Sequence, residues 1–192
     1  MVYSYRRYQS STAIWVLIVL NLLLFVLSIP FPGLIYLMGL QPASFLSAPW
    51  TIVTTMFMHS GFGHIFANML TLFFFGAFLT RLIEEKRFLI VYFLGGIVGS
   101  LSFVWLAPPY SVAVGASGAI YAVGGVLTVL MPRLRVFVFP IPVPLPLWAV
   151  VIGGFVIVSF VPGIAWQAHL GGLVFGLLAG LYFRRRRRYP VY

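Results

Sequence analysis

The lysine and arginine residues of this chain stand in four tight groups, and long apolar stretches without charge separate the groups. A helix that crosses the hydrocarbon core of a bilayer needs roughly 20 mostly apolar residues, and the cytoplasmic loops of membrane proteins collect lysine and arginine. Only 7% of the 192 residues are charged and 62% are hydrophobic, whereas ordinary soluble domains are about one quarter charged. The pattern therefore predicts a multi-pass membrane protein.

The predicted architecture is all-α, with residues 1–192 forming a single membrane domain that has room for six membrane-spanning helices. Segment 30–58 is uncharged but broken by prolines, so we expect it to lie in the outer interface or to re-enter the membrane partly. Residues 136–146 form a second apolar connection rich in proline. The expected spans are approximately 13–29, 61–82, 88–106, 115–131, 147–161 and 167–183.

The charge groups predict the orientation of these spans. With Arg6 and Arg7 inside, six crossings put every basic group and both termini in the cytoplasm, including the basic tail 184–192. The other groups are Arg81, Lys86 and Arg87; Arg133 and Arg135; and Arg184 to Arg188. The three outer connections, 30–58, 107–114 and 162–166, contain no lysine or arginine. A signal peptide over the first apolar stretch is the weaker interpretation, because Leu27-Ser28-Ile29-Pro30 lacks a small-x-small cleavage pattern.

The net charge of +10 does not point to nucleic acid, because the arginines flank membrane segments and no soluble face exists to carry them. We expect the terminal arginines to contact anionic lipid headgroups instead. The chain has no cysteine and no aspartate, and its only acidic residues are Glu84 and Glu85. This excludes disulfides, thiolate metal sites and cysteine nucleophiles.

Polar residues within membrane spans usually mark function, and three of them, on three different spans, are predicted to lie at one depth. Ser117 stands roughly 21 Å above the inner end of its span, at about 1.5 Å per residue. His169 lies about as far above Arg184, and Asn68 lies roughly 20 Å above Arg81. His64 is one helical turn before Asn68 and shares its helix face.

Small residues are spaced so that the fourth and sixth spans can approach closely. The sixth span carries Gly172, Gly176 and Gly180, a small-xxx-small ladder. The fourth span offers Gly118, Ala122 and Gly125 as a matching surface. Their close packing would bring His169 within reach of the Ser117 hydroxyl, the geometry that a hydroxyl nucleophile needs from its base.

Each of these residues has a plainer interpretation when taken alone. A single membrane serine commonly bonds its own helix, a single histidine often serves packing, and a glycine ladder indicates only helix packing. For His59 a structural role is expected, and for Asn21 an interhelical hydrogen bond. A zinc site built from the three histidines lacks an H-E-x-x-H motif and a carboxylate at that depth, and a transporter is disfavoured because no internal repeat is visible. Only the joint pattern favours catalysis.

Three segments together resemble the rhomboid family of intramembrane serine proteases, over roughly residues 40–180. They are Gly115-Ala116-Ser117-Gly118, His64-Ile65-Phe66-Ala67-Asn68 and Ala168-His169-Leu170-Gly171-Gly172. Two positions depart from the family pattern: Thr51 follows Trp50 where an arginine is common, and Thr80 stands where a glutamate is common.

The resemblance implies the role of each residue. Ser117 would be the nucleophile and His169 the general base and acid. His64, Asn68 and the backbone N–H of Ser117 would form the oxyanion hole. The supporting residues would be Gly115 and Gly118 in the turn around the serine, Tyr121 packed against the histidine, and His59.

The resemblance also implies what the protein works on. The substrates would be transmembrane segments of other proteins, cut near the outer face, in the plasma membrane of a prokaryote. No metal and no cofactor would be required. The alternative is a catalytically inactive member of the family that only binds membrane clients.

Overall fold

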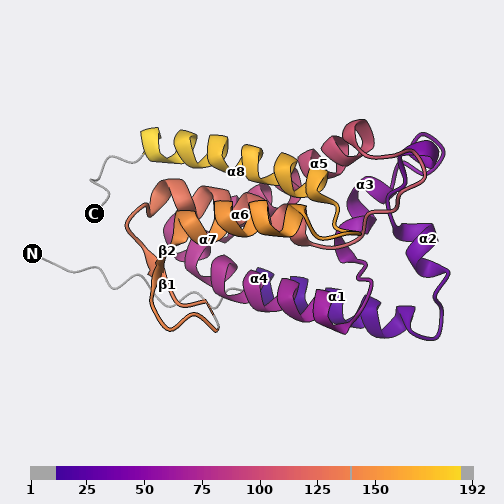
Figure 1. The fold of residues 1–192 in the computed structure, drawn as a ribbon, viewed down its shortest axis with the longest axis horizontal. Coiled ribbons are helices and arrows are strands. Elements are labelled where there is room, and N and C mark those ends of the chain that lie inside the picture. The colour runs from indigo at the N-terminus through magenta and orange to yellow at the C-terminus, as the bar shows by residue number, and fades with distance from the viewer. Residues whose placement is uncertain (1–11, 139, 187–192) are drawn as a thin grey trace, which may run out of the picture.

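A computed structural model describes residues 12–138 and 140–186, and they form a bundle of helices that run along one common direction (Figure 1). The predicted all-α membrane bundle is confirmed. Arg6 and Arg7 lie outside the described residues. The long helices are α1 (Thr12–Ser28), α4 (Phe62–Ile83), α5 (Glu85–Leu106), α6 (Ser117–Leu130), α7 (Leu147–Ser159) and α8 (Trp166–Arg186).

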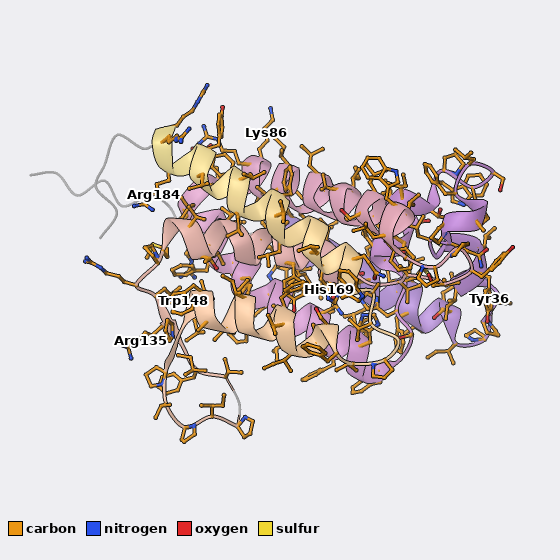
Figure 2. All side chains as sticks on the ribbon, turned by 45° about the horizontal axis from the view of Figure 1, so that its top comes forward. Tyr36, Lys86, Arg135, Trp148, His169 and Arg184 are labelled. Carbon is orange, nitrogen blue, oxygen red and sulfur yellow. The ribbon has the colours of Figure 1, made fainter. Side chains whose placement is uncertain are left out.

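Three of these helices, α4, α5 and α8, are long and apolar enough to cross a membrane. The other three, α1, α6 and α7, are shorter apolar helices at the remaining expected spans. The six crossings themselves stay a prediction. Lys86, Arg135 and Arg184 lie at one end of the bundle (Figure 2), which we call the basic end.

Some helix boundaries differ from the expected spans because a helix need not end where the charges begin. Helix α5 starts at Glu85 instead of residue 88, and an acidic side chain at a helix N-terminus is favourable. Helix α8 continues through Arg186, so the first part of the expected tail 184–192 is helical, and residues 187–192 lie outside the described part. Helix α6 starts at Ser117 instead of residue 115, because Gly115 has a φ of +124°.

Segment 30–58 folds into short helical turns at the end of the bundle opposite the basic end (Figure 1). They are α2 (Leu34–Met38), η1 (Pro42–Ser44), α3 (Thr51–Thr54) and η2 (Thr55–Phe57). The backbones of Leu40 and Ala113 bond each other in both directions, at 3.0 and 2.9 Å. The Ser100 hydroxyl of α5 donates to Ile52 O at 2.8 Å. The segment is therefore attached to the bundle, and its depth in the membrane remains a prediction.

The proline-rich connection 136–146 is more ordered than expected. Its ends form two short antiparallel strands, β1 (Arg135–Val136) and β2 (Leu145–Pro146). Arg135 pairs with Pro146 and Val136 pairs with Leu145. These two-residue strands are a local feature of the connection and leave the fold class all-α.

Helix α6 lies at the centre of the bundle and packs most extensively on α8. All its residues from Ala122 to Thr128 are buried. A Cβ at Gly172 would collide with Gly118 O, and one at Gly176 would collide with Ala122 O. A Cβ at Gly180 would lie 2.8 Å from the Val129 side chain. The glycine ladder therefore faces α6 and brings the two backbones into contact, as predicted.

Candidate active site

Ser117 is the first residue of α6, and two hydrogen bonds fix the strand of chain that leads into it. Gly115 N–H donates to Thr55 O at 2.9 Å, and the Thr55 hydroxyl donates to Ala113 O at 2.6 Å. The positive φ of Gly115 then turns the chain into the helix, a conformation that glycine adopts without steric cost. The first backbone N–H groups of a helix have no hydrogen-bond partner within the helix. Ser117 therefore lies beside several backbone N–H groups that can donate to a ligand.

His169 lies in the second turn of α8, and its Nε2 is 2.7 Å from the Ser117 hydroxyl oxygen. The imidazole is 6% exposed. The two helices come this close because glycine faces the carbonyl of Ala168 from both neighbouring helices. A Cβ at Gly118 would lie 3.2 Å from Ala168 O, and one at Gly99 would lie 2.6 Å from it. The structure thus brings together the serine and the histidine that the sequence pairs.

The aromatic ring of Tyr121 packs over the His169 imidazole. The ring centroids are 4.7 Å apart, with 33° between the planes. Within residues 12–138 and 140–186, the buried Nδ1 of His169 has no hydrogen-bond partner. The Tyr121 ring and the Ser117 hydroxyl thus both contact this imidazole.

His64 approaches Ser117 from α4, with Gly115 between them. A Cβ built on Gly115 would lie 2.7 Å from His64 Nε2 and 3.6 Å from the Ser117 hydroxyl oxygen. Figure 2 shows His169 between the basic end and Tyr36 at the opposite end. Because residue 115 is a glycine, the His64 ring and the Ser117 hydroxyl can face the same small space.

The Ser60 hydroxyl lies 3.1 Å from His64 Nδ1. In the tautomer where Ser60 donates this hydrogen bond, His64 Nε2 carries the proton and can donate toward Ser117. Ser60 was not among the predicted site residues. Its spacing of four residues before His64 is the only signal in the sequence that could have indicated it.

Asn68 is buried one turn beyond His64 on α4. Its amide donates to the backbone carbonyl of His64 at 2.8 Å, which leaves one N–H of the amide for another acceptor. Its Oδ1 has no hydrogen-bond partner among the described residues. The structure therefore puts Asn68 beside His64 but gives it no direct bond to Ser117.

His59 is 1% exposed and packs its ring against the edge of His64, with 5.0 Å between centroids. It lies in the loop before α4, where burial, and then the neighbouring His64, lowers its pKa to about 3. An imidazole with so low a pKa is neutral at physiological pH, which suits a supporting contact. In the described ranges the three histidines do not form a group that could hold a metal ion.

The two departures from the family pattern are satisfied locally. The Thr51 hydroxyl donates to Ala48 O at 2.6 Å, and the Thr80 hydroxyl donates to Ala77 O at 3.1 Å. Asn21, expected to bond another helix, donates to Leu17 O within α1 at 2.7 Å, and its side chain also interacts with the Tyr92 hydroxyl of α5. A short polar side chain in a helix can always reach the carbonyl one turn earlier.

Known proteins are similar to this chain over most of its length. Residues 47–186 match the family model of the Rhomboid domain. The chain is 32% identical over 144 residues to YdcA of Bacillus subtilis (strain 168), an alignment that covers 73% of this chain and 71% of that protein. It is 34% identical over 132 residues to "Rhomboid protease GluP" of the same organism, covering 68% of this chain and 25% of that protein.

A plant relative carries a different name. "Inactive RHOMBOID-like protein 8" of Arabidopsis thaliana is 30% identical over 130 residues, covering 65% of this chain and 35% of that protein. This chain thus spans most of YdcA but only a quarter to a third of the other two. The matched residues include every helix from α4 to α8 and the whole serine–histidine site. This chain is therefore an integral membrane protein that belongs to the rhomboid family.

Proposed function

We propose that this chain is an intramembrane serine endopeptidase that cuts transmembrane segments of other membrane proteins. The observation that carries the proposal is the 2.7 Å contact between the Ser117 hydroxyl oxygen and His169 Nε2. A nucleophile and its base within hydrogen-bond distance, inside an apolar bundle, are the elements that acyl transfer requires.

In the proposed reaction, His169 Nε2 accepts the hydroxyl proton while the Ser117 oxygen attacks the carbonyl carbon of the scissile peptide bond. The tetrahedral intermediate collapses when His169 returns that proton to the leaving amine, and an acyl-enzyme remains. Water then gives a proton to His169 and attacks the ester carbonyl. When the bond to the Ser117 oxygen breaks, His169 returns that proton to the serine, and the new carboxyl terminus is released. The chain needs neither a metal nor a cofactor for these steps.

The oxyanion of each tetrahedral intermediate would be stabilised by His64 Nε2–H, the remaining amide N–H of Asn68 and the backbone N–H of Ser117. Support comes from the position of His64 across Gly115 and from the start of α6 at Ser117. One such donor contributes about 2.7–4 kcal/mol to transition-state stabilisation.

The chain would act in the plasma membrane of a prokaryote, with six crossings and both termini in the cytoplasm. Cleavage would then occur toward the outer face. The alternative is a family member that binds membrane clients without cutting them, since one relative is named inactive. The intact pair of Ser117 and His169 favours the protease.

The experiment is reconstitution of the wild type, Ser117→Ala and Ser159→Ala in vesicles that contain a model transmembrane substrate. We expect cleavage by the wild type and by Ser159→Ala. The native Ser159 hydroxyl donates to Phe155 O in its own helix, so its removal should not affect the site. Removing the nucleophile should reduce turnover on the order of 10⁶-fold. A fluorophosphonate probe should label Ser117 in the wild type and in Ser159→Ala, and should not label Ser117→Ala. Cleavage by Ser117→Ala at the wild-type rate would overturn the proposal.

A further inference from the structure

The hairpin formed by residues 133–148 extends sideways from the basic end and does not fold back onto the bundle (Figures 1 and 2). Its tip is apolar and uncovered: Phe137 is 75% exposed, Val143 55% and Ile141 40%. A soluble protein rarely leaves such a group in water. The tip therefore needs an apolar environment that the described residues do not provide.

Arginines and a tryptophan frame this tip. Arg133 and Arg135 are exposed at its base, and Trp148, in the first turn of α7, is 49% exposed. Tryptophan prefers the boundary between headgroups and acyl chains, and arginine pairs with phosphate. No acidic residue follows Glu85 in the chain, so no carboxylate of the hairpin competes for these arginines.

The backbone of the hairpin suits contact with lipid. Pro140, Pro142, Pro144 and Pro146 have no N–H to leave unbonded. Ile141 N–H donates to Val138 O at 2.7 Å, and Leu147 N–H donates to Leu134 O at 2.8 Å. An unbonded N–H in hydrocarbon is costly, and prolines also prevent the edge from pairing with another strand.

We propose that the hairpin 133–148 is a membrane anchor. Its apolar tip inserts between the lipids of the leaflet at the basic end, and Arg133 and Arg135 bind the phosphates of anionic phospholipids. The exposed apolar surface of α7, with Trp148, Ile152 and Val156, continues this lipid contact along the adjoining helix. The anchor is independent of peptide-bond cleavage, so its test does not depend on the proposed protease activity.

The test uses the absence of cysteine from the chain. Val143→Cys is labelled with bimane in the reconstituted full chain, in phosphatidylcholine vesicles with or without phosphatidylglycerol. Leu178→Cys, 62% exposed on α8, serves as the lipid-facing control. Lys86→Cys, exposed at the basic end, serves as the water-facing control.

We expect nitroxide groups on lipid acyl chains to quench the probe at residue 143 as strongly as the probe at residue 178, and aqueous iodide to quench only the probe at residue 86. Quenching of residue 143 by iodide and not by lipid would overturn the anchor. Cross-linking between Val143→Cys copies that rises with protein density, without lipid quenching, would also overturn it, because a second copy would then cover the tip.

A second comparison tests the arginines. In vesicles with phosphatidylglycerol, the ratio of inserted to free hairpin should fall roughly fivefold for each arginine removed, so Arg133→Gln/Arg135→Gln should lose the effect of the anionic lipid. Arg185→Gln/Arg186→Gln removes the same charge from α8 and should leave quenching at residue 143 unchanged. Equal effects of the two variants would show general charge attraction and would overturn the role of Arg133 and Arg135.

Discussion

The imidazole of His169 packs against the Tyr121 ring, and its Nδ1 has no hydrogen-bond partner among the described residues. In a serine hydrolase with a triad, a carboxylate fixes the tautomer and the orientation of the base. The chain contains no aspartate that could do this. We therefore propose that packing against Tyr121 orients His169.

We predict that Tyr121→Ala slows peptide cleavage about a hundredfold, since a 1 Å displacement of a catalytic group can cost that much. Tyr121→Phe keeps the ring and should retain most of the activity. The measurement is kcat for a transmembrane substrate, with fluorophosphonate labelling of Ser117 as a second readout. Full activity in Tyr121→Ala would refute a positioning role.

Position 115 requires glycine. Its φ of +124° is unfavourable for any side chain, and a Cβ would lie 2.7 Å from His64 Nε2. We predict that Gly115→Ala displaces the His64 ring, lowers kcat and destabilises the fold by about 1–3 kcal/mol. Gly153→Ala is the matched control, because a Cβ there meets no atom within 4 Å. Thermal unfolding and turnover of both variants test this, and equal behaviour would contradict it.

At the scale of elements, the pair α6 and α8 is joined through backbone contacts. A Cβ at Gly176 would collide with the carbonyl group of Ala122. We predict that Gly176→Leu separates the two helices, lowers the melting temperature and abolishes fluorophosphonate labelling of Ser117. Gly154→Leu, on the loosely packed α7, should leave both unchanged. Labelling at the wild-type rate in Gly176→Leu would show that the ladder does not position the site.

Sequence predicts these elements better than the turns between them. Small residues at every fourth position of α8 indicate a close helix contact wherever they occur, so the meeting of Ser117 and His169 follows from local pattern. The Thr55 hydroxyl bonds Ala113, 58 residues later, and no period in the sequence encodes that contact. Ser60 is only four residues from His64, but a single serine at that spacing is too weak a signal to indicate a contact. The pairing of β1 and β2 was missed because two-residue strands leave no alternation to detect.

At the scale of the whole molecule, the labelled basic side chains lie at one end of the bundle, and the site of Ser117 and His169 lies away from that end. Lys86, Arg135 and Arg184 mark the basic end, and α2 and α3 lie at the opposite end (Figures 1 and 2). The positive-inside rule then predicts which end faces the cytoplasm. The six-crossing orientation depends on this distribution and not on the length of each helix.

We predict that an impermeant maleimide labels Tyr110→Cys in intact cells and labels Lys86→Cys only after permeabilisation. Tyr110 is 82% exposed in the loop after α5, and Lys86 is exposed at the other end of that helix. The absence of native cysteine makes the readout unambiguous. Labelling of Lys86→Cys in intact cells would invert the proposed orientation.

The glycine contacts between α6 and α8 also affect how the protein can respond to different membranes. Helix α6 has only 14 residues, about 21 Å of helix, and hydrocarbon cores vary by several ångströms around roughly 30 Å. Two helices joined backbone to backbone cannot slide past each other to match such a change. The bundle must instead tilt as one body or deform the surrounding lipid, so the spacing of Ser117 and His169 is insulated from bilayer thickness.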